Sequence, residues 1–564
     1  MAGVKLKKLP IGIDDFKKII EERYYFVDNS EFINELINKG EQVMLVTRPR
    51  RFGKTLTLSM LKYFYDHREP NNDLFDGLEV GKANLESEKN KYPVIFFSLK
   101  ELKDAKWENT YEKIRNTMQT VYNENEEVVK KLNKSEKEYY EKIMNGNASQ
   151  VDLELSLKKI TEYLERYYGK KVILLIDEYD TPIISGFSNN YFTEVIDFMR
   201  NYLSAALKTN TSLKFAVMTG ITKVSKENLF SGLNNLEVSS VINGTYGEFF
   251  GFTEDKVIKM LEYYDMIDKI NEVRTWYNGY KFGTAQVYNP WSIINYAKHR
   301  ELKTYWVNTS SDSLIKDMLR KNIEYVKDGL NKLIRREPLE TYINENINYD
   351  ILKTSKENIW NLFLQSGYLT VKEKVVDIYV NEWENDLQEK YLLEIPNNEV
   401  RSLYISIIKY WLMDSIGSDM VAKLLEELTT GDIENFKEMF KDIVEKYFSY
   451  YDTDKQKGEE FYHAFSLGLF VNLMIKYKVE SNRESGYGRS DILLIPNDKT
   501  KRGIIIEIKR QKFEEKDLEE TANDALKQIE QKKYRLELEK EGIAEIAEIG
   551  IGFRGKECEM KYRK

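Results

Sequence analysis

The sequence is poor in the side chains that crosslink small secreted proteins or bind zinc. Its 564 residues include one cysteine, Cys558, and three histidines, His67, His299 and His463. One cysteine cannot form an intrachain disulfide, which excludes a fold stabilised by such bonds. A zinc site made of cysteine and histidine needs more of these ligands than the chain offers. Any metal must therefore be held mainly by carboxylates, hydroxyls and water, which favours magnesium or manganese.

Long hydrophobic runs are also missing. No window approaches the ~18 consecutive apolar residues that cross a bilayer, and the N-terminal segment lacks the apolar centre of a signal peptide. We therefore expect a soluble, cytoplasmic protein without a membrane partner. The net charge of −8 does not favour general coating of nucleic acid, but it leaves local basic patches open.

The chain is rich in charged and aromatic residues and long enough for several domains. Charged residues make up 32% and hydrophobic residues 42%, a composition that argues against long disorder. At about 150 residues per domain, we expect roughly four units. The predicted boundaries are 1–250 for an α/β domain, 251–400 for a helical lid or winged-helix-like region, 401–454 for a helical spacer, and 455–564 for a second α/β domain.

Four short apolar runs predict a parallel sheet in the first domain. They are residues 42–47, 94–97, 172–176 and 215–218, and longer amphipathic segments separate them. Such alternation is typical of a parallel sheet buried between helices. In the next region, by contrast, two strand-like runs at 366–371 and 391–395 predict a small two-strand wing beside helices.

The first apolar run leads into the segment RPRRFGKT, residues 48–55. A Gly-Lys-Thr triplet between a buried strand and a helix is the context of a phosphate-binding loop, where amide groups and the helix dipole attract an anion. We expect Lys54 to reach the β- and γ-phosphates of ATP and the Thr55 hydroxyl to bind Mg²⁺. Because Arg48 stands where such loops usually begin with glycine, a plain helix N-terminus with an exposed lysine remains the alternative.

A second strand ends in acids that complete the predicted nucleotide site. Residues 172–176 run into Asp177 and Glu178, and the carboxyl end of a parallel strand faces the ligand crevice. We expect Asp177 to hold magnesium and Glu178 to polarise the attacking water, while Asp180 caps or turns the chain. The predicted nucleotide-binding residues are Arg48, Pro49, Arg50, Arg51, Phe52, Gly53, Lys54, Thr55, Asp177 and Thr219.

Two further residues near this site have open roles. Thr219 follows the apolar run 215–218, and it either senses the γ-phosphate or only forms a turn. Arg200 either serves as an arginine finger toward a neighbouring subunit or is a surface charge, and we favour the surface charge. A homo-oligomer is compatible with the sequence but is not indicated by it.

A second group of acids lies near the C-terminus. Residues 489–495 and 503–509 predict a β-hairpin. Because strand side chains alternate, Glu507 and Lys509 share one face while Ile506 and Ile508 point into the core. Asp491 can lie beside them on the partner strand. Two carboxylates suit Mg²⁺ or Mn²⁺, and a lysine can orient the water that attacks a phosphodiester; the alternative is an edge hairpin with a solvated polar face.

Supporting residues surround this hairpin in the sequence. His463 is a candidate metal ligand, although a buried structural histidine is equally compatible. Gln528 and Lys532 stand four residues apart on one predicted helix face, where Gln528 can contact water or substrate. Lys532 and Lys533 either bind phosphates or are solvated.

These motifs carry two family resemblances. Residues 5–250 resemble the AAA-ATPase-like family of P-loop proteins, through LPIGIDDFKKII, residues 25–28, 48–55, 174–180 and 219–221, with 277–281 and 288–291 extending the match. In that family arginine also occupies the first-glycine position, so Arg48 looks like a family trait. Residues 455–555 resemble the PD-(D/E)XK nuclease superfamily, through 488–491, 507–509 and 528–534.

The resemblances imply a P-loop ATPase joined to a restriction-endonuclease-like domain, with ATP and Mg²⁺ as cofactors and Mn²⁺ as an alternative metal at the nuclease site. We expect an ATP-regulated nuclease acting on nucleic acid, with DNA favoured over RNA. The expected catalytic residues are Glu178, Asp491, Glu507, Lys509 and Gln528. The expected metal ligands are Thr55, Asp177, Asp491, Glu507 and His463. The rivals are an ATPase switch whose C-terminal domain binds nucleic acid without cleaving it, and a non-enzymatic scaffold.

Overall fold

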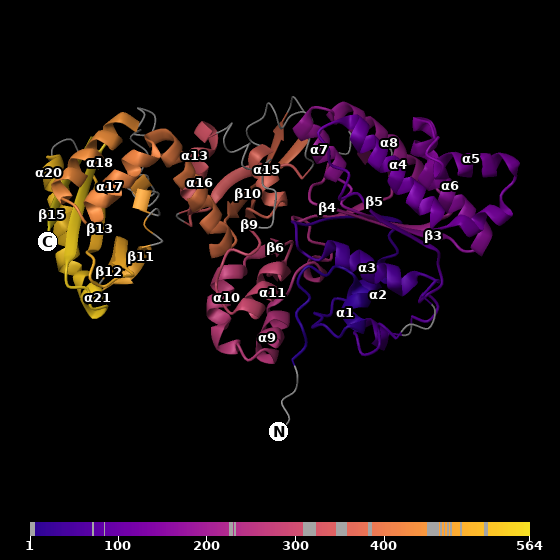
Figure 1. The fold of residues 1–564 in the computed structure, drawn as a ribbon, viewed down its shortest axis with the longest axis horizontal. Helices are drawn as coiled ribbons and strands as arrows, with labels where there is room; N and C mark the ends of the chain where they lie inside the picture. The colour runs from indigo at the N-terminus through magenta and orange to yellow at the C-terminus, as the bar shows by residue number, and fades with distance from the viewer. Residues whose placement is uncertain are drawn as a thin grey trace, which may run out of the picture. The chain divides into compact units, whose positions relative to one another are not determined.

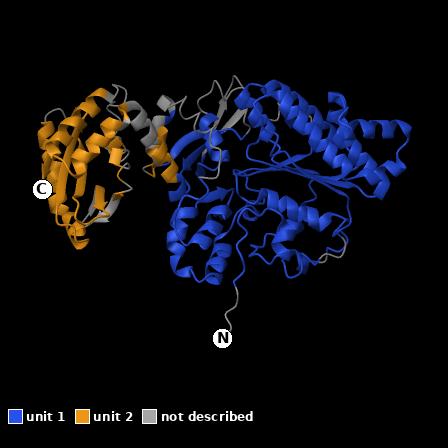
Figure 2. Ribbon diagram, in the orientation of Figure 1, with its two compact units in different colours: residues 1–326, 338–400 blue, residues 327–337, 401–564 orange. Residues whose placement is uncertain are grey.

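The computed structural model describes residues 6–69, 73–83, 85–224, 229–230, 233–307, 323–334, 336–345, 358–381, 386–447, 462, 465–466, 469–470, 473, 476–485, 488–511, 517–555 and 557–564. The chain forms two compact units, residues 1–326 with 338–400 and residues 327–337 with 401–564 (Figure 2). The predicted region 251–400 thus lies largely in the first unit. The described part of 401–454 lies in the second.

A five-stranded parallel sheet forms the centre of the first unit. Its order is β2-β3-β4-β1-β5, and its strands are β1 (Val43–Thr47), β2 (Val94–Ser98), β3 (Val172–Asp177), β4 (Leu213–Gly220) and β5 (Leu236–Ser239). The four apolar runs lie in β1 to β4, so the predicted parallel α/β fold is confirmed. The sequence pattern did not reveal β5, which pairs with β1 at one edge.

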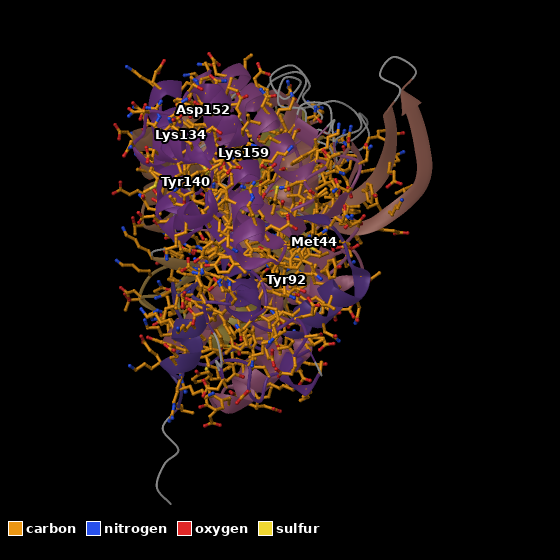
Figure 3. All side chains as sticks on the ribbon, turned by 90° about the vertical axis from the view of Figure 1, so that its right-hand side faces the viewer. Met44, Tyr92, Lys134, Tyr140, Asp152 and Lys159 are labelled. Atoms are coloured by element: carbon orange, nitrogen blue, oxygen red, sulfur yellow. The ribbon has the colours of Figure 1, made fainter. Side chains whose placement is uncertain are left out.

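Helices cover both faces of this sheet (Figure 1). On one face lie α1 (Phe16–Glu21), α2 (Glu31–Lys39) and α3 (Lys54–Tyr65), and on the other α4 (Trp107–Asn123), α5 (Lys134–Met144), α6 (Gln150–Tyr168), α7 (Thr181–Asn189) and α8 (Phe192–Leu207). Apolar side chains of α1 to α3 and of the sheet form one core, which includes Met44 of β1. Figure 3 labels Met44 and, on α5, the buried Tyr140.

Local capping explains where two of these helices begin. Asn133 and Ser149 each accept a hydrogen bond from the amide three residues ahead, and Glu136 and Asp152 bond back to the capping residue. This reciprocal arrangement satisfies amide groups that have no partner inside the helix. The helices α5 and α6 therefore start where the sequence supplies a capping box.

Helices and small antiparallel sheets make up the rest of the first unit. They are α9 (Glu254–Tyr263), α10 (Ile270–Tyr277), β6 (Tyr280–Phe282), β7 (Ala285–Val287), α11 (Pro290–His299), β8 (Leu339–Ile343), α15 (Asn358–Gln365), β9 (Thr370–Asn381) and β10 (Asp386–Glu394). The order β8-β10-β9 makes a three-stranded sheet, larger than the predicted two-strand wing because β8 adds a strand. Residues 366–369 form a turn before β9.

A five-stranded mixed sheet forms the centre of the second unit. Its order is β11-β12-β13-β14-β15, with strands β11 (Tyr477–Ser485), β12 (Gly488–Pro496), β13 (Gly503–Arg510), β14 (Ile546–Arg554) and β15 (Glu557–Arg563). Only the β13–β14 pair is parallel. The helices are α16 (Asn398–Ile416), α17 (Ser418–Thr429), α18 (Ile433–Tyr447), α20 (Leu518–Lys532) and α21 (Arg535–Lys540), while α13 (Ile323–Ile334) and α16 cross the unit boundary.

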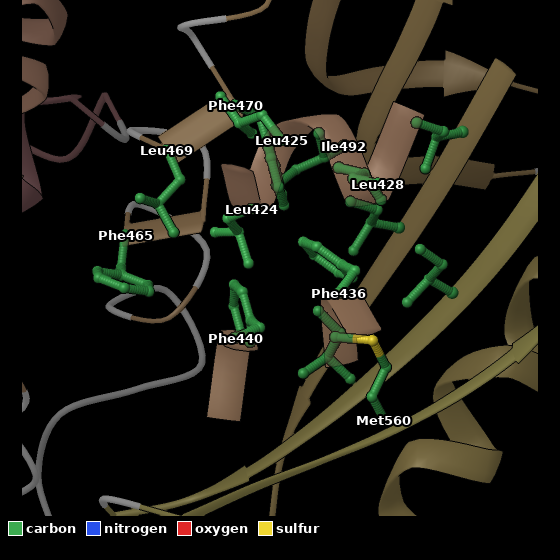
Figure 4. Packing of buried hydrophobic residues seen from close by; sticks show 14 of the residues in the cluster. Leu424, Leu425, Leu428, Phe436, Phe440, Phe465, Leu469, Phe470, Ile492 and Met560 are labelled. Carbon is green, nitrogen blue, oxygen red and sulfur yellow. The ribbon is translucent and has the colours of Figure 1, made fainter. Parts of the chain in front are cut away.

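The two faces of this sheet bury different sets of residues. Leu424, Leu428, Phe436 and Phe440 of α17 and α18 pack with Ile492 and other strand residues in one core (Figure 4). Helices α20 and α21 cover the other face. Residues 416–447 are therefore part of the core of the second unit, where the sequence had suggested a spacer.

Strand β13 carries its side chains alternately to these two cores. Ile504, Ile506 and Ile508 pack with α17 and α18, as the alternation predicted. Ile505 packs with α20, so Glu507 belongs to the face that α20 covers. No helix in the described parts of the chain is long and apolar enough to span a bilayer.

Gly550 allows α20 to approach the sheet closely. It pairs with Glu507 in the β13–β14 register, and a Cβ added here would lie 2.4 Å from Ala522 O and 2.5 Å from Leu526 N. Both neighbours are backbone atoms, so the helix would have to move. We expect Gly550→Ala to destabilise the second unit by about 1–3 kcal/mol, measured by chemical unfolding. Unchanged stability would contradict this packing of α20 on β14.

Candidate functional site

The loop between β1 and α3 has the strand–loop–helix order that the sequence predicted. Thr47 ends β1 and Lys54 begins α3. Gly53 caps the helix with a φ of 83°, in the left-handed region. A Cβ at this position would meet no atom within 4 Å, so the backbone conformation, and not crowding, favours glycine here.

Lys54 lies inside this loop. Its side chain is 6% exposed, and Nζ donates to the carbonyl oxygens of Arg48 and Pro49, each at 2.9 Å. Burial lowers the pKa of Lys54, and the charges of Glu178 and Asp177 act in the opposite direction. The alternative of an exposed lysine at a plain helix start therefore does not describe this residue.

Asp177 gathers hydroxyl groups from three elements. Strand β4 is the neighbour of β3, whose last residue is Asp177. The hydroxyl of Thr219, near the end of β4, donates to Asp177 Oδ1 at 2.6 Å. Thr55 of α3 donates to Asp177 Oδ2 at 2.8 Å, and Ser98 of β2 lies 3.3 Å from the same oxygen. A carboxylate beside hydroxyl oxygens is a donor set that suits Mg²⁺. Ser98 was not among the predicted site residues, although its place at the end of an apolar strand was a usable signal.

The two acids after Asp177 have different surroundings. Glu178 has a φ of 52°, its carboxylate accepts a hydrogen bond from Thr181 Oγ1 at 3.1 Å, and its amide lies 3.4 Å from Thr219 Oγ1. Asp180 is buried and accepts hydrogen bonds from the amides of Ile221 and Thr222 and from the Thr222 hydroxyl. Asp180 thus holds the turn after β4, and its side chain makes no capping hydrogen bond to α7.

In the second unit, Asp491 and Glu507 lie on neighbouring strands. Asp491 Oδ2 accepts the amide hydrogen of Ile508 at 2.8 Å, and the amide of Asp491 lies 3.4 Å from Glu507 Oε2. Each carboxyl group therefore contacts the backbone of the opposite strand. Glu507 is buried, with 3% of its surface exposed.

Residues from α20 and from the turn after it complete this group. Gln528 Nε2 donates to Glu507 Oε1. Tyr534 is buried, and burial raises its pKa to about 12, with the charges of Glu507 and Asp491 adding to the shift. The motif in the sequence gave Tyr534 no role of its own, because its nearness to Glu507 and Asp491 depends on how α20 crosses the sheet.

Burial disfavours the charged form of Asp491. Burial raises the pKa of Asp491 to about 6, although the Ile508 amide and the positive charge of Lys509 both act to lower it. Within the described ranges no cluster contains three or more histidine, cysteine, aspartate or glutamate side chains suited to a metal. The donor set is thus two carboxylates, which fits a cation such as Mg²⁺ that retains several waters. His463 lies outside the described residues.

Two protein families match the chain in these regions. A family described as "Predicted AAA-ATPase" matches residues 10–230, and the "PD-(D/E)XK nuclease superfamily" matches residues 457–563. The chain contains an AAA-ATPase-like domain and a PD-(D/E)XK nuclease superfamily domain. Both resemblances drawn from the motifs are confirmed. An "Uncharacterized protein in vnfD 5'region" of Azotobacter chroococcum mcd 1 is 28% identical over 498 residues, 87% of each chain.

Arg48 of the AAA-ATPase-like domain points away from the phosphate loop. Its guanidinium is fully buried and donates to the carbonyls of Thr47, Ser239 and Thr245 and to the Ser239 hydroxyl. It also lies 4.8 Å from the ring centroid of Phe282. Burial lowers the pKa of Arg48 to about 9. The position of Arg48 in the motif predicts a nucleotide contact, but the side chain bonds to Ser239 of β5, and the Arg48 carbonyl accepts a hydrogen bond from Lys54.

Aromatic residues beyond the AAA-ATPase match cover the loop. Phe52 is buried against the rings of Tyr280 and Phe282, with centroids 5.0 and 5.1 Å away, and it also lines an apolar pocket beside Gly53. Pro49 lies so close to Gly367 that a Cβ on Gly367 would be 2.8 Å from the proline ring. These partners lie more than 200 residues along the chain, which is why sequence spacing could not indicate them.

Arg50 and Arg51 meet two tryptophans. Trp306 Nε1 donates to the carbonyl of Arg50 at 3.0 Å. The Arg51 guanidinium lies 4.4 Å from the ring centroid of Trp291, within the range of a cation–π contact. The basic loop is therefore held by aromatic groups on one side.

The remaining charged candidates lie on α8 and at the end of α20. Arg200 pairs with Asp197 one turn away on α8, at 3.0 Å, with 37% of its side chain exposed. Lys532 ends α20, and Lys533 follows in the left-handed conformation with a φ of 55°. The surface placement that we favoured for Arg200 agrees with this geometry.

Proposed function

We propose that the AAA-ATPase-like domain binds and hydrolyses Mg²⁺–ATP and that the PD-(D/E)XK domain cleaves phosphodiester bonds in nucleic acid with Mg²⁺ or Mn²⁺. In this proposal the nucleotide state regulates cleavage. The proposed cleavage activity rests on one observation: the carboxyl groups of Asp491 and Glu507 lie on neighbouring strands, and Gln528 donates a hydrogen bond to Glu507.

The arrangement around Lys54 supports the ATPase half. The buried ammonium lies among loop carbonyls, from which it can turn to the β- and γ-phosphates of a bound nucleotide. Thr55 and Asp177 would hold the magnesium, which would neutralise phosphate charge. Thr219 orients Asp177 through its hydrogen bond, and Glu178 is the residue proposed to polarise the attacking water.

An apolar pocket beside Gly53 supports the binding of a nucleotide base. Its lining includes Pro10, Tyr25, Val27, Phe52, Gly53 and Met260. The pocket adjoins the helix start where phosphates would bind, and a flat, largely apolar ring can bury its faces in such a space. Pro10 and Ile19 of the LPIGIDDFKKII segment line this pocket.

The cleavage mechanism assigns separate roles to the residues of the second site. Asp491 and Glu507 would hold the divalent cation, which supplies positive charge to the phosphate. Lys509 would orient the attacking water through its positive charge. As the water oxygen bonds to phosphorus its proton passes to solvent, and the P–O ester bond breaks with the leaving oxygen taking a proton from solvent. Gln528 fixes the orientation of the Glu507 carboxylate.

A substrate panel tests this proposal. The full-length protein is incubated with supercoiled DNA, linear DNA and RNA in Mg²⁺ or Mn²⁺, with ATP, with a non-hydrolysable analogue and without nucleotide. We expect cleavage that stops on chelation and changes with the nucleotide. Binding without cleavage in every state would favour the ATPase switch with a nucleic-acid-binding domain. Absence of both ATP turnover and cleavage would favour the scaffold.

Metal binding at the second site should depend on pH. Because burial raises the pKa of Asp491 to about 6, the group is protonated at acid pH and fully ionised only above about pH 7. A cation must displace this proton, so we expect its affinity to fall by about tenfold per pH unit below pH 6 and to level off above pH 7. Titration with Mn²⁺, followed by electron paramagnetic resonance, measures this. The same slope in Asp491→Asn would contradict the assignment.

A further inference from the structure

A buried carboxylate lies at the start of α16, the helix that leads from the first unit into the second. Glu399 is in the first turn of this helix and has no exposed surface. Oε2 accepts a hydrogen bond from Ser292 Oγ and Oε1 accepts one from the amide of Trp306, both at 2.6 Å. The amides of Tyr305 and Val307 also bond to this carboxylate. One side chain thus joins α16, the segment 305–307 and the first turn of α11.

Glu399 bonds to the backbone of one tryptophan, Trp306, and to Ser292, the residue that follows another tryptophan, Trp291. Trp306 is held through its own amide. Trp291 immediately precedes Ser292 in α11, and its Nε1 lies 3.3 Å from the carbonyl of Tyr305. Networks of buried hydrogen bonds fix the orientation of their members. The carboxylate therefore sets the position of both indole rings.

Both indole rings contact the phosphate loop. Trp306 Nε1 donates to the carbonyl of Arg50, and Trp291 lies under the guanidinium of Arg51. The carbonyls of the two preceding residues, Arg48 and Pro49, hold the ammonium of Lys54. When Lys54 turns to a phosphate it must release those carbonyls, and the loop segment next to Trp306 must adjust.

We propose that Glu399 positions the phosphate loop through Trp306 and Trp291, and that occupancy of the loop by a nucleotide is thereby transmitted to the first turn of α16. The inference rests on the nucleotide binding proposed above. Its physical basis is a continuous series of hydrogen bonds, from the Arg50 carbonyl through Trp306 to Glu399. Residues of α16 from 401 onward belong to the second unit, so the helix that contains Glu399 is covalently continuous with the nuclease-bearing half.

Hydrogen–deuterium exchange on the full-length protein tests this inference. Peptides that cover residues 398–404 are followed with and without a non-hydrolysable ATP analogue and Mg²⁺. A coupling of ordinary size changes the local opening equilibrium by about fivefold or more, and we expect slowing of that order in the wild type. Trp306→Phe keeps an aromatic ring but removes the donor to Arg50, and we expect it to abolish the nucleotide-dependent slowing. Glu399→Gln is expected to have the same effect.

Matched substitutions distinguish coupling from general destabilisation. Trp276→Phe changes a partly buried tryptophan on α10, and Glu272→Gln changes an exposed acid that pairs with Lys269. We expect both to retain the nucleotide-dependent slowing at 398–404. If Glu399→Gln fails to fold, Trp306→Phe alone decides.

A binding measurement in the same samples separates the two proposals. Nucleotide affinity is measured with a fluorescent ATP analogue. Wild-type protein that binds nucleotide without altered exchange at 398–404 would overturn the coupling and leave the proposed function intact. Full retention of the slowing in Trp306→Phe would overturn it as well. Wild-type protein that binds no nucleotide would refute both.

Discussion

Replacing Glu507 with glutamine is expected to lower metal-dependent cleavage of nucleic acid by about a thousandfold or more. The change removes one of two negative charges that would hold the cation, and it places an amide donor opposite Gln528 Nε2, which now donates to Glu507 Oε1. A divalent cation contributes several kcal/mol to the stabilisation of phosphate charge, and each 1.36 kcal/mol corresponds to a factor of ten in rate. Single-turnover cleavage of a labelled duplex measures the loss.

The matched control for this substitution is Glu541→Gln. Glu541 belongs to the same unit and pairs with Lys499 at 2.9 Å with half of its side chain exposed. We expect this variant to cleave like the wild type. Glu507→Gln should still bind nucleic acid and unfold cooperatively. Wild-type cleavage rates in a folded Glu507→Gln protein would show that the β12–β13 acids do not cut.

Replacing Lys54 with alanine is expected to reduce ATP turnover by at least about a hundredfold. The Lys54 ammonium is a buried charge within residues 48–55, and its buried position makes its attraction to phosphate stronger than it would be in water. The substitution also frees the carbonyls of Arg48 and Pro49, so a moderate loss of stability accompanies the loss of activity. Steady-state phosphate release measures turnover, and unfolding curves measure stability.

Lys62→Ala provides the comparison on the same helix. Lys62 lies about 12 Å further along α3, where its ammonium lies over the rings of Tyr63 and Phe96. We expect this variant to hydrolyse ATP at the wild-type rate. If Lys54→Ala and Lys62→Ala lose turnover equally, the phosphate loop assignment is wrong. If nucleotide regulates cleavage, Lys54→Ala should also remove the effect of ATP on the nuclease.

The parts of the two sites that sequence could predict are local in the chain. The Gly-Lys-Thr triplet and the acids after β3 each lie within a few residues of a strong apolar run, and the rule that parallel strands end at one edge brings them together. The same holds for Asp491 and Glu507, because a short hairpin places them opposite each other. Strand alternation then assigned Ile506 and Ile508 to the core.

The parts that the sequence could not predict depend on contacts between residues far apart in the chain, or on a strand that lacks a continuous apolar run. Strand β5 has four residues, of which one is fully buried, so it lacks the continuous apolar run that marks its neighbours. Arg48 was expected at the phosphates because of its position in the motif, but its long side chain reaches carbonyls at 239 and 245. Nothing within the loop itself indicates that direction.

The sequence of residues 416–447 contains the spacing of helices with a buried apolar face, but its many charged residues led to the prediction of a spacer. Leu424 and Leu428 stand four residues apart, as do Phe436 and Phe440, and all four are buried in one core. This spacing is typical of a helix with one apolar face. The many charged residues between them suggested a solvated spacer, although charge on the opposite face is what such a helix requires.

The aromatic residues Tyr280 and Phe282, which pack against Phe52, limit where the chain can be truncated. The AAA-ATPase match ends at residue 230, yet Tyr280, Phe282 and Trp306 all follow that point. A truncated protein that stopped at the end of the match would present Phe52 and Pro49 to water and invite aggregation. The smallest autonomous fragment of the AAA-ATPase-like domain therefore has to extend through Trp306 and on to the turn 366–369, which contains Gly367.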